Sequence, residues 1–182
     1  MRLHPLPPEI SQLLRGLDAP PKLVAHLALV HAAAVTLTGK LKEQWPDLLY
    51  DQQAVLIGAA MHDIGKVLYP RELTQPGNQH EEAGPGLLIA HGLSEDHARF
   101  ARTHARWQQE DAVQLEDLLV AFADHIWKGA RNNLLEEEIA RRIAPLCNET
   151  FWDVYLQLDE IADELAEGAH ERILWQEAAD FS

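Results

Sequence analysis

The residues best suited to chemistry are the adjacent pair His62 and Asp63, which follow an apolar run within residues 54–66, AVLIGAAMHDIGK. A helix without a polar face is expected in the interior, so this run predicts a central, fully buried helix. Burying an imidazole and a carboxylate without partners would cost on the order of several kcal/mol. Neutral imidazole nitrogen and carboxylate oxygen are ordinary ligands of divalent cations, so the pair indicates a metal site.

The same dipeptide has a simpler interpretation. His62 could cap the helix while Asp63 pairs with Lys66, and short motifs of this kind have a high false-positive rate. Gly65 is expected to end the helix in a left-handed conformation. Either way, three ionisable side chains are predicted at the end of a buried helix.

Other polar residues interrupt apolar stretches elsewhere. His26 and His31 lie in LVAHLALVHAAAVTL, and at least one of them should point inward, although a single histidine on an apolar face is more often a satisfied core residue. Asp124 lies in LEDLLVAFADHIWKGAR. Lys128 and Arg131 follow it by four and seven residues, so all three are expected on one helical face. An ordinary i,i+4 salt bridge is the alternative for the first two.

The elements that must position these residues are predicted to be helices. β-branched residues and strict alternation are sparse, which favours an all-α fold, a single-domain helical bundle. Pro20 and Pro21 open a helix that should end before Pro46. The spacing predicts further helices over residues 51–64, 94–108 and 115–131, one that begins near His80 with a capping box from Asn78 to Glu81, a long loop over 69–79, and two or three helices in the C-terminal third.

Composition limits the classes of function. The chain has 182 residues, 47% hydrophobic, which predicts one domain over residues 1–182. Its formal charge of -14 argues against a nucleic-acid polymer or an anionic membrane as partner. Cys147 is the only cysteine, so no intramolecular disulfide can form. No signal peptide or membrane span is evident, and the expected location is cytoplasmic.

Taken together, the order of a His, a His-Asp pair in HDIGK and a later Asp resembles the HD-domain metal-dependent phosphohydrolase superfamily, in its HDIG-type, stand-alone form. The likeness covers roughly residues 20–131, with the C-terminal helices at 134–182 outside it. It implies a metal site that takes a histidine from the first long helix. The family usually has a valine four residues after this histidine. His26 is preferred because Val30 stands at that position, but Val35 follows His31 in the same way.

Some branches of this superfamily add two histidines that hold a second metal. Here the resemblance places them at His80 and His104, with His91 and His97 as competing positions. The implied ligands are His26, His62, Asp63, His80, His104 and Asp124. They would hold one or two divalent ions, with Fe, Mn, Mg, Zn, Co and Ni all open.

The implied reaction is hydrolysis of a small phosphoester, a nucleotide or a dinucleotide, by a metal-bound hydroxide. Two ions about 3.5–4 Å apart can polarise a phosphoryl oxygen and hold a hydroxide in line with the leaving group. Asp63 and Lys66 are the expected catalytic residues. Lys66, Lys128 and Arg131 are expected to bind substrate phosphate, because a chain this acidic needs local positive charge to hold an anion.

Departures from known branches narrow the substrate. ARWQQED after His104 lacks the pattern of cyclic-di-GMP phosphodiesterases, and Ile-Gly-Lys after Asp63 lacks the acidic pair of guanosine tetraphosphate hydrolases. Two other classes stay open: an HD-type di-iron oxygenase with the same six ligands, and a non-catalytic metal- or ligand-binding module. The apolar stripe that starts at Phe151 is usual core packing, but it could also cover the site or form a homodimer seam.

Overall fold

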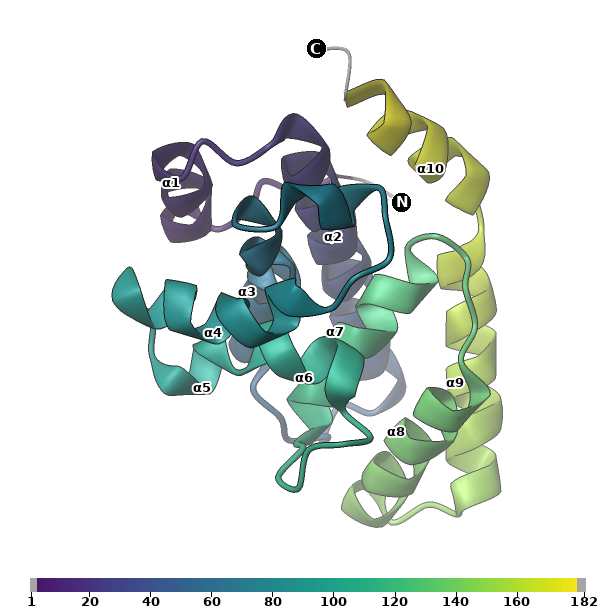
Figure 1. The fold of residues 1–182 in the computed structure, drawn as a ribbon. Helices are drawn as coiled ribbons and strands as arrows, with labels where there is room; N and C mark the ends of the chain where they lie inside the picture. The colour runs from purple at the N-terminus through teal and green to yellow at the C-terminus, as the bar shows by residue number, and fades with distance from the viewer. Residues whose placement is uncertain (1–2, 180–182) are drawn as a thin grey trace.

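A computed structural model describes residues 3–179, and every regular element in that range is a helix, which confirms the all-α prediction (Figure 1). The α-helices are α1 (Pro8–Gly16), α2 (Pro21–Gln44), α3 (Gln52–Met61), α4 (Gln79–Ala90), α5 (Glu95–Ala98), α6 (Phe100–Arg106), α7 (Leu115–Ile126), α8 (Asn133–Cys147), α9 (Phe151–Ala166) and α10 (Ala169–Ala178). Two 3-10 helices, η1 (Ile64–Val67) and η2 (Pro70–Leu73), lie between α3 and α4.

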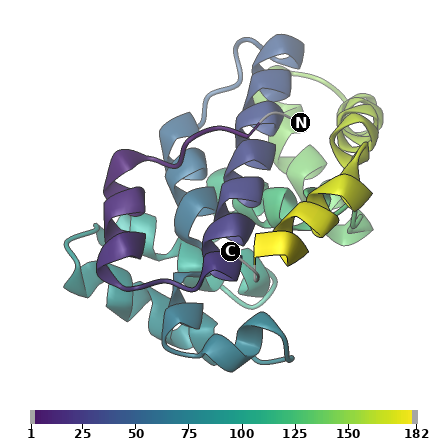
Figure 2. The ribbon, with the colours of Figure 1, turned by 90° about the horizontal axis from the view of Figure 1, so that it is seen from above.

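Helices α2, α3 and α7 pack against one another at the centre (Figure 1). On one side α4 and α6 pack against each other, α4 also contacts η1, and α6 contacts α7. On the other side α8 and α9 pack as a pair, with α8 against α7 and α9 against α2. Figure 2 shows α1 and α10 on opposite sides of α2. The helices that carry the six predicted ligands are therefore neighbours.

Helix α2 is long and apolar enough to cross a membrane by length and composition alone. However, 67% of its most apolar window is buried inside the protein. Almost every residue from Leu23 to Ala34 is buried or half-buried, including Leu27 and Val30 with no exposed surface. The burial is that of a core helix in contact with α3, α7 and α9.

Local signals set several helix ends. Pro21 is the first residue of α2, where its missing N–H costs nothing, and α2 ends before Pro46. Asp51 caps α3 by accepting from the Ala54 N–H at 2.9 Å. Gln114 and Asp117 form a capping box at the start of α7. Asp117 also accepts from Arg99 Nε at 3.1 Å, so the same carboxylate fixes the segment before α6 against α7.

The prediction for the end of α3 was wrong in two respects. The helix ends at Met61, and Gly65 lies in η1 without a positive φ. Gly65 is required for space instead: a Cβ there would lie 2.1 Å from the His80 carbonyl oxygen. The absence of a side chain allows η1 to approach the backbone of α4, which brings the His62–Asp63 turn next to His80.

Gly65→Ala is therefore expected to destabilise the protein by about 1–3 kcal/mol, because the atom in the way belongs to the backbone and must move. Gly39→Ala in α2 is the matched control. A Cβ there meets nothing within 4 Å, so alanine should stabilise the helix by about 0.5–1 kcal/mol. Urea unfolding of both variants measures the difference. Equal midpoints for Gly65→Ala and wild type would contradict the packing argument.

Other helix boundaries also differ from the predictions. The expected helix over 94–108 is divided into α5 and α6, and the one over 115–131 ends at Ile126. Asn78 makes no side-chain cap, because the N–H groups of Gln79 and His80 donate to the Glu72 carboxylate instead. The predicted loop over 69–79 contains η2. Helix α3 is mostly buried, but Leu56 and Ile57 are only half-buried.

The C-terminal third supplies three helices, as expected, up to the last described residue. The stripe that starts at Phe151 is core packing: Val154, Leu158, Ile161 and Leu165 are buried, and α9 contacts α8, α2 and α7. The predicted single domain over 1–182, with C-terminal helices over 134–182, stays a prediction; residues 1–2 and 180–182 lie outside the described range.

Candidate metal centre

The fold brings all six predicted ligands to one place. Their side chains come from α2 (His26), the end of α3 (His62 and Asp63), α4 (His80), α6 (His104) and α7 (Asp124). All four histidines and Asp63 are buried, and the Asp124 side chain is 20% exposed. Five segments of the chain thus converge on one small volume beneath the surface.

Asp63 lies between two groups of histidines, with one carboxylate oxygen toward each. Its Oδ2 lies 3.1 Å from His26 Nε2 and 3.7 Å from His62 Nε2. Its Oδ1 lies 3.1 Å from His80 Nε2 and 3.5 Å from His104 Nε2. A carboxylate in this position can bridge two cations.

Asp124 completes the first group. Its Oδ1 lies 3.4 Å from His26 Nε2 and 3.6 Å from His62 Nε2. The two Nε2 atoms of His26 and His62 are themselves 3.2 Å apart. Two imidazole nitrogens and two carboxylate oxygens are therefore directed at one point.

The other ring nitrogens define how three of these histidines are oriented. Nδ1 lies 3.1 Å from the Ala59 carbonyl oxygen in His62 and 3.0 Å from the Phe100 carbonyl oxygen in His104. In His80 it lies 2.5 Å from Glu72 Oε2. Since these partners only accept, Nδ1–H must donate, and the neutral ring directs an Nε2 lone pair at Asp63 or Asp124.

This arrangement fits a divalent cation. Asp63 Oδ1 is buried and has no hydrogen-bond donor, because lone pairs of His80 and His104 face it. The ligand atoms of His26, His62 and Asp63, and those of Asp63, His80 and His104, each lie within 4.8 Å of one another. Nitrogen and oxygen lone pairs that converge without protons between them call for a cation, and this donor set suits first-row divalent metals.

The two carboxylates are held ionised. Burial by itself raises the pKa of Asp63, but in the cation-free site the positive charge of a protonated His62, and hydrogen bonds from protonated His104 and His26, lower it well below its usual range. Burial likewise raises the pKa of Asp124, but His62, His26 and Lys128 lower it by more, so that this pKa also lies well below its usual range. Both groups are therefore charged at neutral pH, as metal ligands must be.

A cavity of about 380 Å³ opens above these ligands. Two of the residues predicted to bind phosphate line it, Lys66 and Lys128. Lys66 Nζ lies 2.5 Å from Asp63 Oδ2, and Lys128 Nζ lies 3.9 Å from Asp124 Oδ2. Glu81 and His125 also line it, although neither is among the residues predicted from the sequence. Their only sequence signal is that each directly follows a predicted ligand.

Arg131 does not lie at this cavity. Because α7 ends at Ile126, the shared face predicted for Asp124, Lys128 and Arg131 does not form. The Arg131 guanidinium binds Glu136 in α8 and Asp159 and Asp163 in α9. Its predicted contact with substrate phosphate has no geometric support, since its donors hold α8 and α9 together.

His31, the alternative first ligand, lies elsewhere in the core, and its buried Nδ1 has no hydrogen-bond partner. Desolvation, with a smaller effect of His4, lowers its pKa to about 4. In the unfolded chain the pKa is about 6.5, so the unfolded state binds the proton more readily. The stability that neutral His31 provides above pH 6.5 is thus lost as the pH falls toward 4.

The loss from His31 should amount to about 2–3 kcal/mol between pH 6.5 and 4. His31→Leu removes the group, so its free energy of unfolding should fall less over this range than that of wild type. His170→Leu, which replaces an exposed histidine in α10, is the control. Urea unfolding at several pH values measures the slopes. Parallel slopes for wild type and His31→Leu would contradict the assignment.

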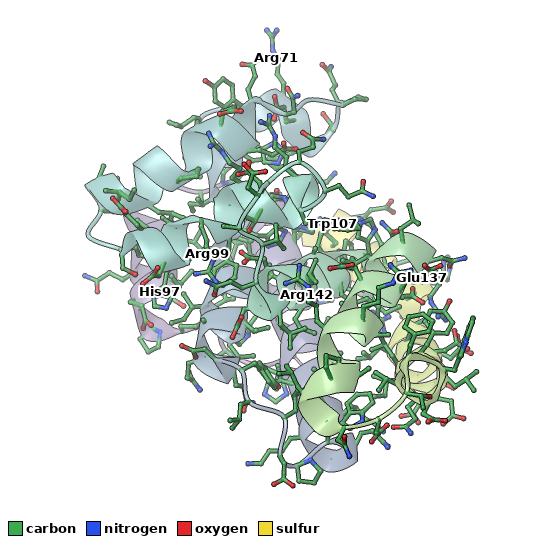
Figure 3. All side chains as sticks on the ribbon, turned by 90° about the horizontal axis from the view of Figure 1, so that it is seen from below. Arg71, His97, Arg99, Trp107, Glu137 and Arg142 are labelled. Carbon is green, nitrogen blue, oxygen red and sulfur yellow. The ribbon has the colours of Figure 1, made fainter. Side chains whose placement is uncertain are left out.

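His91 and His97, the competing positions for the second metal, are not brought to the site. They line a separate cavity together with Glu9 and Gln12 of α1. Figure 3 shows His97 at the edge of the molecule, on the opposite side of Arg99 from Trp107. His80 and His104 are thus the two histidines of that region that face Asp63.

Comparisons with known proteins agree with this geometry. A family model described as HD domain matches residues 18–128, more than half of the chain. All six converging residues lie inside the matched range. Neither the comparison with curated proteins nor that with solved structures finds a match.

Proposed function

The chain belongs to the HD domain family, whose members are mostly metal-dependent phosphohydrolases, and from this premise we propose that it hydrolyses a small phosphoester with the help of two divalent cations. The observation that carries the proposal is Asp63, whose two oxygens face separate histidine groups, His26 with His62 and His80 with His104. Asp124 adds a second carboxylate to the first group.

When bound, divalent cations supply Lewis-acid polarisation of a phosphoryl oxygen and lower the pKa of a water molecule. The protein's own contribution is to hold the ligands ionised and oriented before any cation arrives. The hydrogen bonds from the Nδ1–H groups of His62 and His104 to backbone carbonyls fix these two rings. The site therefore needs little rearrangement when it loads.

Lys66 and Lys128 are proposed to bind the substrate's phosphoryl group. Both line the cavity, and their positive charges oppose the negative charge of the whole chain. Lys66 is the more enclosed, with 19% of its side chain exposed against 39% for Lys128. Lys66 is thus suited to the reacting phosphoryl group and Lys128 to the outer part of the anion.

The cavity volume favours a small substrate. About 380 Å³ is near the lower end of the range for small-molecule sites, which suits one phosphorylated group with a modest substituent, such as a mononucleotide. Two lysines also match the charge of one phosphomonoester better than that of a polyphosphate. We therefore favour a phosphomonoester over a dinucleoside polyphosphate within the proposed class.

The test begins with metal content. Protein purified without chelator should contain about two equivalents by elemental mass spectrometry, and His104→Ala should retain about one. His97→Ala, a histidine outside the site, should retain both. The Mn²⁺-loaded protein is then offered 4-nitrophenyl phosphate, 5′-mononucleotides and dinucleoside polyphosphates, and phosphate release is measured.

Two results would contradict the proposal. Oxygen uptake by the iron-loaded protein, measured with an oxygen electrode and accompanied by no hydrolysis, would place the chain among the oxygenases. Metal binding without turnover of any phosphoester or of oxygen would indicate a binding module.

A further inference from the structure

A carboxylate that the sequence analysis did not select, Glu72 of η2, contacts one of the candidate ligands directly. Its Oε2 lies 2.5 Å from His80 Nδ1, and only 9% of its side chain is exposed. The opposite ring nitrogen, His80 Nε2, lies 3.1 Å from Asp63 Oδ1. Glu72, His80 and Asp63 thus form a line in which the first carboxylate orients the imidazole toward the second.

Glu72 fixes the backbone of His80 as well as its ring. The Gln79 N–H donates to Glu72 Oε1 at 3.1 Å, and the His80 N–H donates to Oε2 at 3.2 Å. These are N–H groups at the start of α4, which have no partner within the helix. One carboxylate therefore sets where α4 begins and how its first inward-facing side chain is turned.

The chain around Glu72 leaves it little freedom. A Cβ on Gly77 would lie 2.4 Å from Glu72 Oε1 and 2.5 Å from Cδ. The absence of a side chain at Gly77 therefore provides the space that this carboxylate fills. Any larger residue there would displace Glu72 from His80.

Two other candidate histidine ligands, His62 and His104, have a weaker second contact. The Nδ1 atoms of His62 and His104 lie next to neutral backbone carbonyls. A carboxylate partner makes an imidazole a better electron donor and holds its tautomer more firmly than a carbonyl does. The orientation of His80 therefore depends on a residue of η2, outside the helix that carries His80, whereas His62 and His104 are oriented by carbonyl groups of α3 and α6.

We propose that Glu72 is the positioning residue for a second cation, which His80, His104 and Asp63 would hold. It directs the His80 Nε2 lone pair toward Asp63, and without it the second cation would bind more weakly than the one that His26, His62, Asp63 and Asp124 would hold. This inference rests on the two-cation site of the proposed function.

The test is Mn²⁺ titration of the metal-free full chain by calorimetry. Wild type should bind two equivalents. In Glu72→Gln, the affinity for one equivalent should fall about 10–100-fold while the other is unchanged. Glu82→Gln is the matched control, because Glu82 lies in α4 near His80 but pairs with Arg102 and Arg106 instead. It should bind both equivalents as wild type does.

A second variant separates position from charge. Gly77→Ala keeps the Glu72 carboxylate but obstructs its place, so it should weaken the same equivalent. Unchanged affinities in both variants would overturn the proposal, and so would equal weakening of both equivalents, because that indicates a general structural role.

A measurement without metal keeps the two proposals distinguishable. Nitrogen-15 NMR of metal-free wild type should show neutral His80 protonated at Nδ1, and Glu72→Gln should populate the Nε2–H tautomer. If wild type binds only one Mn²⁺, the two-cation function fails, while this tautomer shift still supports the role of Glu72. An unchanged His80 tautomer in Glu72→Gln would overturn that role.

Discussion

Asp63→Asn is expected to remove both cations and to lower phosphoester hydrolysis by about 1,000-fold or more. The physical reason is that, of the six predicted ligands, Asp63 is the one that faces both histidine groups, with Oδ2 toward His26 and Oδ1 toward His80. An amide is a neutral and weaker ligand. Loss of the several kcal/mol that bound cations contribute to the transition state corresponds to a rate change of this size.

The measurement combines metal analysis with thermal unfolding. Added Mn²⁺ should raise the melting temperature of wild type, since a ligand that binds only the folded state stabilises it, but should leave Asp63→Asn unchanged. Asp96→Asn, which alters an exposed carboxylate in α5, is the control and should respond as wild type does. Two retained equivalents in Asp63→Asn would contradict the bridging role.

Arg131→Met is expected to lower the free energy of unfolding by about 3 kcal/mol, because it leaves a buried carboxylate without its partner. The Glu136 side chain is only 1% exposed, and it accepts from Arg131 Nε at 2.9 Å and from Nη2 at 2.6 Å. The same guanidinium also binds Asp159 and Asp163 in α9. Glu136, the largest cause, and Asp159 in turn raise the pKa of Arg131.

Arg141→Met is the matched control for this pair. Arg141 binds Glu137 four residues earlier in α8, and the two side chains are 57% and 35% exposed, against 1% for Glu136, so the change should cost less than about 0.5 kcal/mol. Chemical unfolding of the two variants compares them.

Kinetics then decide between the two roles considered for Arg131. If it only holds α8 to α9, folded Arg131→Met should hydrolyse substrate with the KM of wild type. A raised KM with unchanged stability would instead support the phosphate contact predicted from the sequence.

The helical class and the chemical interest of the His62–Asp63 pair were predictable from the chain, because both depend on residues that are close in sequence. The prolines at the start of α2 act within a few residues, so their effect can be read directly from the chain. The HDIGK segment directly follows an apolar run, and this local pattern also indicated a buried site. The His-Asp pair and the later Asp then led to the family that the family model matches.

Which of several equivalent residues face the candidate metal centre depends on tertiary contacts. His26 and His31 lie on the same helix about 140° apart, and spacing could not say which side faces the partner helices. The contacts of α2 with η1 and α7 direct His26 inward to Asp63 and Asp124. Likewise, because α7 ends at Ile126, Arg131 does not share a helical face with Asp124 and instead binds Asp159 of α9.

Glu72 is the clearest case of a residue that no local pattern could reveal. It lies eight residues before His80, in a stretch expected to be a loop, and it matters because η2 folds back on the start of α4. Gly77 leaves space for the Glu72 side chain and Gly65 lets η1 approach the His80 backbone, and both effects depend on packing between segments. Helix formation depends on neighbours in sequence, so it was predictable; the position of a carboxylate beside a histidine depends on how separate segments pack, so only the folded chain defines it.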